Sequence, residues 1–234
     1  MKIGLLKCDI FSQGKTDLYD ERVKILRDMF NSPKEVYIQI EIICDEKRFL
    51  EADCLIVKED AKLDLIVSDM EFVETRLERT DNQQEQMLLD KLKEQLESGL
   101  FLNSLTLNEQ EKTIASAYSL LTMKAVVVAE EQDLTDKHSL LMRAYQQAGY
   151  ISFFTAGEKD AHAWPLKKGL TAYDAAGVIH TAIKQGFIRA EVVNFKELVA
   201  DGSLSKARAN NHVRLETKEY VVQDGDYLII RTNK

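Results

Sequence analysis

Apolar positions in the first 61 residues predict alternating strands and helices. Runs at 2–8, 35–43 and 54–57 are short, apolar and bounded by polar or turn residues, which is typical of buried strands. Apolar residues at helical spacing predict a helix over 15–30, which ends before Pro33 because proline disfavours the α conformation in the residue before it. Strand–helix–strand order predicts a small parallel α/β sheet.

Residues 62–120 carry the apolar spacing of long helices. One helix over 62–79, a polar break and a second helix from residue 85 predict an antiparallel hairpin with charged, solvated outer faces. A third helix follows Asn108, which is a predicted N-cap. Strand and helix patterns return at 124–149, so we expect the hairpin to be an insertion in the α/β sheet.

The remaining residues predict several short strands around one helix, an order similar to a β-grasp. The helix spans 171–186, with Thr171 as N-cap and Gly186 as its end. We therefore expect a mixed α/β and α+β chain with three parts. These are a small α/β domain (1–61 plus 121–149), a helical hairpin (62–120) and a β-grasp domain (150–234).

Composition and charge narrow the classes of function. With 45% hydrophobic and 30% charged residues, no apolar run near the roughly 20 residues of a membrane span and no signal peptide, we expect a cytoplasmic protein. Cys8, Cys44 and Cys54 are expected to be buried free thiols. The net charge of −8 disfavours general nucleic-acid binding, and no DNA or membrane partner is expected. From residue 151 onward, however, 12 basic residues outnumber 10 acidic ones, which permits contact with RNA.

One candidate phosphate-binding loop is present. Gly14, Lys15 and Thr16 match the second half of G-x-x-x-x-G-K-[ST], in which backbone amides and the lysine hold phosphates and the threonine holds Mg²⁺. Asp9 stands where the first glycine belongs, and its carboxylate disfavours a triphosphate. The favoured interpretation is that these residues only begin a helix. Binding of ATP or GTP with Mg²⁺ is the alternative.

Basic residues of the C-terminal part are candidates for a face that contacts a polyanion or a protein partner. They are Lys167, Lys168, Lys184, Arg189, Lys206, Arg208 and Arg214. Ordinary solvated surface explains them equally well. The four histidines are dispersed without metal-ligand spacing, and His180 is interpreted as structural. No residue is predicted to be catalytic.

Three blocks of the C-terminal part carry a resemblance to a known family. "FFTAGEKDAHAWPLKKG", "AAGVIHTAIKQGFIRAEVV" and "YVVQDGDYLIIR" resemble the TGS-type β-grasp domain of the YchF / Obg-like ATPase family, over nearly all of 150–234. The stretch "LESGLFLNSLTLNEQEKTIASAYSLLTMK" is similar to the family's coiled-coil insertion. The first 60 residues resemble the family's opening strand, P-loop and helix loosely. The resemblance implies a Ras-like P-loop domain, a helical arm and a TGS domain.

The nucleotide domain departs from the family's pattern. Where the family has D-x-x-G, this chain has Asp45 followed by Arg48, and "VVVAEEQDL" lacks the asparagine of N-x-x-E. The resemblance therefore implies a degenerate YchF-like binding or regulatory module with little or no nucleotide hydrolysis. Its expected partners are the ribosome, RNA or a translation-related protein. A weak ATPase or GTPase that needs a partner, and a scaffold whose helical arm binds a protein, are the alternatives.

Overall fold

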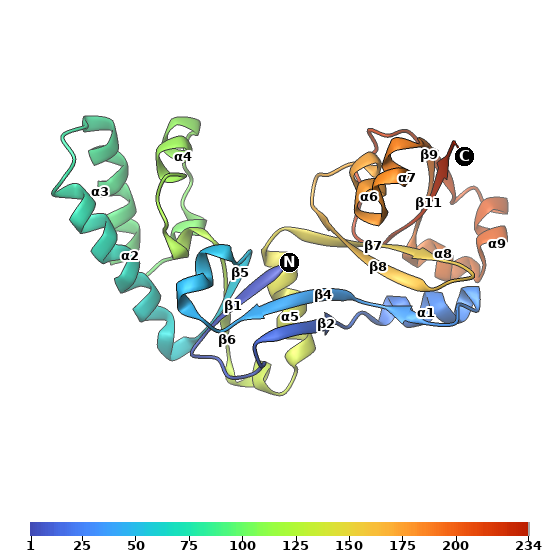
Figure 1. The fold of residues 1–234 in the computed structure, drawn as a ribbon, viewed down its shortest axis with the longest axis horizontal. Coiled ribbons are helices and arrows are strands. Elements are labelled where there is room, and N and C mark those ends of the chain that lie inside the picture. The colour runs from blue at the N-terminus through green and yellow to red at the C-terminus, as the bar shows by residue number, and fades with distance from the viewer. Residues whose placement is uncertain (234) are drawn as a thin grey trace. The chain divides into compact units, whose positions relative to one another are not determined.

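The protein is described by a computed structural model covering residues 1–233, in which the chain forms two compact units (Figure 1). The first unit contains Met1–Thr16 and Ile40–Ala148. The second contains Asp17–Gln39 and the chain from Gly149 onward. The chain therefore passes from one unit to the other three times.

The first unit is built on a five-stranded sheet with the order β2-β4-β1-β5-β6. Its strands are β1 (Lys2–Leu6), β2 (Gly14–Leu18), β4 (Ile38–Ile43), β5 (Cys54–Lys58) and β6 (Ala125–Ala129). β1 pairs in parallel with β4 and β5, and β5 pairs in parallel with β6. The predicted parallel pairing is therefore present among β1, β4, β5 and β6, and the sheet resumes at β6 after the insertion.

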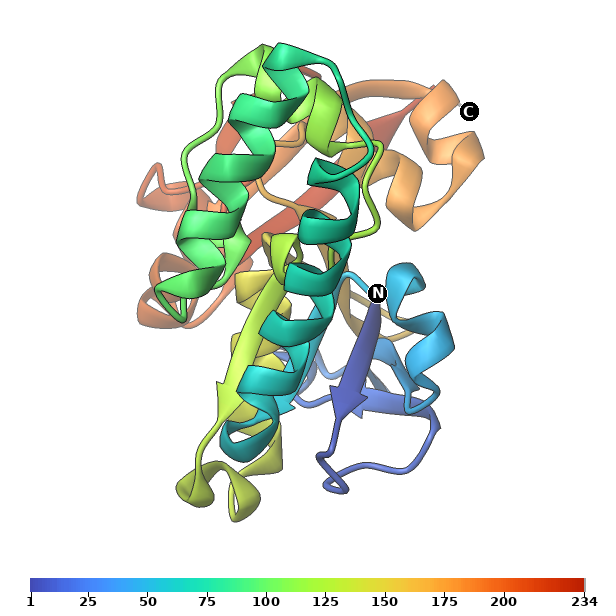
Figure 2. The same cartoon turned by 90° about the vertical axis from the view of Figure 1, so that its left-hand side faces the viewer.

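The helices of the first unit include the predicted hairpin. They are α2 (Lys62–Leu77), α3 (Gln83–Glu97), α4 (Glu109–Ala115) and α5 (Lys137–Gln147), with the 3₁₀ helices η1 (Glu46–Glu51), η2 (Glu59–Ala61), η3 (Leu102–Ser104), η4 (Leu121–Met123) and η5 (Glu131–Leu134). Figures 1 and 2 show α2 and α3 side by side. Val73, Leu88 and Leu92 lie in a buried cluster between them. Asn108 caps α4 in a capping box, as predicted.

The second unit contains a six-stranded sheet with the order β10-β9-β11-β7-β8-β3. Its strands are β3 (Glu35–Val36), β7 (Tyr150–Ala156), β8 (Ala161–Lys167), β9 (Phe187–Asn194), β10 (Arg214–Glu216) and β11 (Asp226–Thr232). Its helices are α1 (Glu21–Phe30), α6 (Ala172–Ile179), α7 (Thr181–Gln185), α8 (Phe195–Asp201) and α9 (Leu204–Ala209). β7 and β11 run in parallel, and β8 and β9 are antiparallel to them. Thr171 caps α6 and Gly186 ends α7, as predicted.

The predicted helix over 15–30 is wrong in its first part. Gly14–Leu18 forms strand β2, and α1 begins only at Glu21. From Asp17 to Asp20 the residues alternate between exposed and buried, which is the two-residue period of a strand. The side chain of Asp20 then accepts a hydrogen bond from the Arg22 amide and caps the helix.

The assignment of 17–39 to the first domain differs from the structure, which places this segment in the second unit. Arg22 pairs with Asp224 at 2.8 Å, and the Phe30 and Tyr227 rings stack with centroids 5.0 Å apart. β3 also pairs with β8. The two side-chain contacts join segments about 200 residues apart, and the strand pairing is also non-local, which periodicity along the chain does not reveal.

Smaller differences concern single elements. The predicted helix 171–186 breaks at His180, whose extended backbone separates α6 from α7. Cys44 is exposed and not buried, because it follows the last residue of β4. Among the helices of residues 1–233, none is both long and apolar enough to cross a membrane.

Candidate functional site

The candidate phosphate-binding residues lie at the edge of the first sheet. Gly14, Lys15 and Thr16 are in β2, the terminal strand, and Lys15 is exposed. Gly14 has φ +132°, which is not a helical conformation. A phosphate held by a P-loop contacts amides at the start of a helix. Both interpretations of Gly14, Lys15 and Thr16, as a phosphate-binding loop and as a plain helix start, assumed that a helix begins here. That prediction is wrong.

A hollow of about 360 Å³ lies instead at the carboxyl ends of β1 and β5. It is lined by Lys7, Cys8, Asp9, Ile10, Lys58 and Lys137. In α/β sheets, ligands bind in the crevice outside the carboxyl ends of the strands. This hollow has that topological position and contains three lysines against one aspartate.

The three ammonium groups of this hollow already have partners. Lys7 pairs with Asp64 at 2.5 Å and Lys58 with Asp60 at 3.2 Å, and the Lys137 ammonium donates to the Ile10 carbonyl at 2.9 Å. An ammonium has three donors, so each retains capacity for a phosphate oxygen. Burial raises the pKa of the Cys8 thiol, which keeps it protonated and unreactive. The arrangement suits anion binding and supplies no nucleophile.

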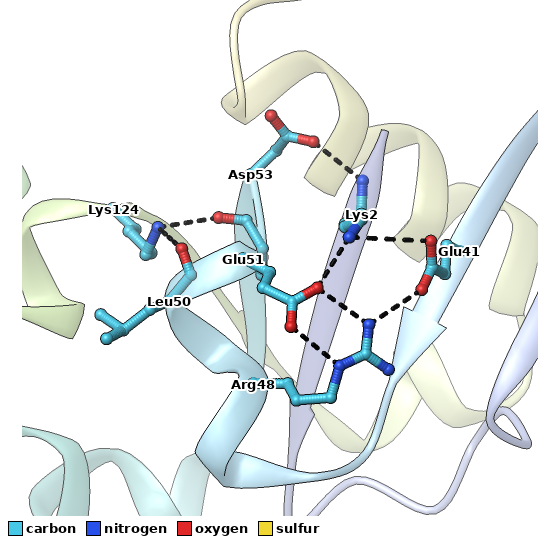
Figure 3. Close-up of polar contacts among 8 residues, drawn as sticks. Lys2, Glu41, Arg48, Leu50, Glu51, Asp53 and Lys124 are labelled. Carbon is cyan, nitrogen blue, oxygen red and sulfur yellow. Dashed lines mark hydrogen bonds and ion pairs between the residues drawn. The ribbon is translucent and has the colours of Figure 1, made fainter.

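The segment in which the resemblance places D-x-x-G forms η1. Asp45 caps this short helix by accepting a hydrogen bond from the Lys47 amide at 3.1 Å. The Arg48 guanidinium bonds to Glu41 at 3.2 Å and to Glu51 at 2.8 Å (Figure 3). Asp45 and Arg48 therefore hold local structure.

Figure 3 also shows how this network reaches the start of β1. The Lys2 ammonium donates to Glu51 at 2.7 Å, and the Lys124 ammonium donates to the carbonyls of Leu50 and Ala52 at 2.9 Å each. Hydrogen bonds from Arg48 and Lys2 lower the pKa of Glu51 to about 2. The carboxylate stays ionised and ties η1 to β1.

The segment in which the resemblance places N-x-x-E follows β6 and is likewise structural. Glu130 and Asp133 form a capping box at η5, in which the Glu130 amide donates to Asp133 at 2.8 Å. Asp133 is buried and pairs with Arg143 at 2.8 Å. The side chains at this position cap a helix, and Asp133 also forms an ion pair with Arg143.

The residues of the predicted basic face differ in their contacts. Lys184 pairs with Asp174 at 3.2 Å, and the Lys167 ammonium lies 3.8 Å from the centre of the Tyr150 ring. Lys168, Arg189 and Lys206 are exposed. Arg208 and Arg214, in contrast, line one hollow.

This hollow, of about 240 Å³, contains an arginine that the sequence analysis missed. Its lining residues are Glu191, Arg208, Val213, Arg214, Leu215 and Arg231. We call Arg208, Arg214 and Arg231 the arginine cluster. Arg231 lies 40 residues from Glu191 in the chain but stands opposite Arg189 across the β9–β11 pair, so strand pairing was the signal that could have revealed it.

One buried carboxylate orients two guanidinium groups of the arginine cluster. The Glu191 side chain is 8% exposed and accepts hydrogen bonds from Arg208 at 2.7 Å and from Arg231 Nε at 2.8 Å. Burial acts to raise the pKa of Glu191, but the hydrogen bonds from the two arginines outweigh it and lower the pKa. The arginine side chains remain 49% and 58% exposed, so they present positive charge to solvent in fixed positions.

Two of the histidines, His180 and His212, serve local structure. His180 Nδ1 accepts a hydrogen bond from the Ala182 amide at 3.1 Å and caps α7. His212 pairs with Asp201 at 2.7 Å. Within residues 1–233, no group of three or more His, Cys, Asp or Glu side chains is placed to hold a metal ion.

Comparisons with known proteins identify relatives of this chain. The family model YchF-GTPase_C, described as a protein of unknown function (DUF933), matches residues 150–233. The "Ribosome-binding ATPase YchF" of Bacillus subtilis is 30% identical over 240 aligned positions, which cover 75% of this chain and 66% of that protein. "Obg-like ATPase 1" of Danio rerio is 42% identical over 81 residues, which cover 35% of this chain and 20% of that protein. The chain thus spans less than two thirds of these curated relatives.

The fold is also that of a solved relative. The structure of the Schizosaccharomyces pombe YchF GTPase superposes with a TM-score of 0.76, covering 99% of this chain and 97% of that one at 17% identity. The family model, the curated relatives and this fold agree. The chain belongs to the YchF / Obg-like ATPase family.

Proposed function

We propose that this chain is a binding module that contacts ribosomal RNA in the cytoplasm and acts without nucleotide hydrolysis. The observation that carries the proposal is the position of Gly14, Lys15 and Thr16 in strand β2. Phosphoryl transfer depends almost entirely on positioning and on charge stabilisation around the phosphates. A lysine and a threonine in an exposed edge strand provide neither.

The other nucleotide-binding segments support the same proposal. Arg48 stands where a switch glycine would contact the phosphate, and its guanidinium is bound to Glu41 and Glu51. Asp133, in the base-selecting segment, is buried against Arg143. Rebuilding a nucleotide site would break these ion pairs. We therefore propose a degenerate P-loop domain that now serves as a structural support.

The arginine cluster is the proposed contact surface. Relatives of this chain carry the name ribosome-binding ATPase, and the matched segment 150–233 contains the whole cluster. Arginine binds phosphate through two parallel hydrogen bonds, and a guanidinium held in place by Glu191 loses little freedom on binding. The second unit, which we propose to be TGS-like, would thus bind the RNA backbone.

Binding to a structured ribosomal RNA fragment, followed by fluorescence anisotropy at several salt concentrations, tests this surface. Replacing both Arg208 and Arg214 by glutamine is expected to weaken binding about tenfold or more and to lower the salt slope by about two. The matched control replaces Lys167 and Lys168 by glutamine, which removes the same charge elsewhere in the second unit. Equal losses in the two double variants would contradict a localised surface.

The three-lysine hollow supports a second candidate function, weak binding of ATP or GTP without the P-loop residues. Lys7, Lys58 and Lys137 surround the carboxyl ends of β1 and β5. This candidate predicts that Lys137→Ala reduces nucleotide affinity whereas Lys15→Ala does not. If Lys15→Ala alone abolishes binding, both this candidate and the proposed degenerate loop are wrong.

A further inference from the structure

A second hollow of the second unit has a different chemical character from the arginine cluster. It has a volume of about 530 Å³ and lies beside β3 and β8. Asp17, Glu35, Tyr37, His162 and Trp164 are among its lining residues. A concave site of this size with aromatic walls and a few polar groups is typical of ligand-binding pockets.

The aromatic wall of this hollow is held in place by its neighbours. The His162 and Trp164 rings stack with centroids 3.6 Å apart and an interplanar angle of 9°. The Trp164 indole N–H donates to the Thr155 hydroxyl at 3.0 Å, which fixes the orientation of the ring. Burial lowers the pKa of His162, so the ring is neutral near pH 7 and does not repel a cation.

The carboxylates of the hollow differ in their contacts. Glu35 accepts a hydrogen bond from the Tyr37 hydroxyl and pairs with Arg27 at 2.7 Å. Asp17 is exposed, and no hydrogen bond or ion pair to it is described within residues 1–233. The charge that remains uncompensated beside the aromatic rings is therefore negative.

We propose that this hollow binds the guanidinium group of an arginine side chain from a partner protein. A guanidinium is planar, stacks on aromatic faces and pairs with a carboxylate through a fork of N–H donors. A lysine ammonium satisfies the carboxylate but has no flat face to stack on the rings. Phosphate groups are disfavoured because Asp17 repels them.

The hollow shares no residue with the arginine cluster, and its charge has the opposite sign. RNA binding can fail while arginine binding persists, and the reverse also holds. The two proposals therefore have separate tests.

The test uses the fluorescence of Trp164, which is the only tryptophan of the chain. The probe is the peptide acetyl-Gly-Gly-Arg-Gly-Gly-amide, and the control peptide has citrulline, a neutral isostere, in place of arginine. We expect a saturable change with a dissociation constant in the millimolar range for the arginine peptide and none for the citrulline peptide. Asp17→Asn is expected to weaken binding roughly three- to tenfold. Glu71→Gln, which removes an exposed charge from α2, should leave binding unchanged.

Several outcomes would overturn the proposal. If the citrulline peptide binds as tightly as the arginine peptide, the site does not recognise the positive charge. If a lysine peptide binds as tightly as the arginine peptide, the site does not recognise the guanidinium group. Tighter binding of free arginine would indicate a small-molecule site, and tighter binding of adenosine a site for a nucleobase. Unchanged affinity in Asp17→Asn, with an unchanged melting temperature, would exclude Asp17 from the site.

Discussion

At the scale of single residues, charged side chains of this chain form ion pairs that serve two different purposes. Glu51 and Glu191 each bind two cationic side chains, and both have lowered pKa values. In the arginine cluster the guanidinium groups stay half exposed, whereas Arg48 in η1 bonds to two carboxylates. The same type of ion pair therefore supports structure in one unit and presents charge in the other.

Gly4 in β1 is required by close packing. A Cβ at this position would lie 2.6 Å from Leu55 Cδ2 and 2.9 Å from Phe49 Cδ1, and both side chains are buried. Because these neighbours have no free space to move into, Gly4→Ala is expected to lower the free energy of unfolding by about 1–3 kcal/mol. Urea denaturation measures this change.

Gly157 provides the control for this prediction. A Cβ there meets no atom within 4 Å. Gly157→Ala is therefore expected to change stability by less than about 0.5 kcal/mol. Equal destabilisation by the two substitutions would show that overpacking at β1 is not the cause.

At the scale of elements, local signals in the sequence predicted where helices begin and end. They did not predict which segments pack or pair with each other. Asn108, Thr171 and Gly186 act at the positions where capping chemistry places them. The segment 14–18 was misassigned because the apolar residues after it share helical spacing, whereas its pairing with β4 is non-local. A propensity read along the chain does not contain that pairing.

The candidate functional sites were likewise predicted only where the signal is local in the sequence. Arg208 and Arg214 were identified from composition, but Arg231 was missed because β11 brings it to Glu191 from a distant part of the chain. The hollow beside β3 and β8 could be found only once residues 17–39 were known to belong to the second unit, because this segment forms part of its lining. Both sites depend on tertiary pairing, which one sequence does not reveal.

The turn between α2 and α3 depends on Glu85, whose contribution changes with pH. Hydrogen bonds from Arg76, Thr80 and Tyr118 lower the pKa of Glu85 to about 2 from an ordinary value of 4.5. The resulting stabilisation is present above pH 4.5 and is lost as the pH falls toward 2. Glu85→Gln is expected to cost about 1–2 kcal/mol at pH 7.

Thermal or urea unfolding across this pH range checks the prediction for Glu85. The difference between Glu85→Gln and the wild type should shrink as the pH falls below 4.5. Glu71→Gln, on the exposed face of α2, serves as the control and should show no such trend. A difference that stays constant with pH would contradict the role of the ionised carboxylate.

At the scale of the whole molecule, the chain has the fold of its family. It covers nearly all of a solved YchF structure but less than two thirds of its curated relatives. Helix caps and ion pairs hold η1 and η5 in the first unit. The arginine cluster lies in the segment that the family model matches. From this arrangement we propose that the chain contacts the ribosome independently of nucleotide.

Co-sedimentation with purified ribosomes, in the absence of nucleotide and with saturating Mg²⁺ and ATP or GTP, tests this claim most directly. The account predicts the same bound fraction in all three conditions, the same fraction for Lys15→Ala, and phosphate release no faster than in the absence of the protein. Binding to ribosomes that requires ATP or GTP and is lost in Lys15→Ala would contradict it.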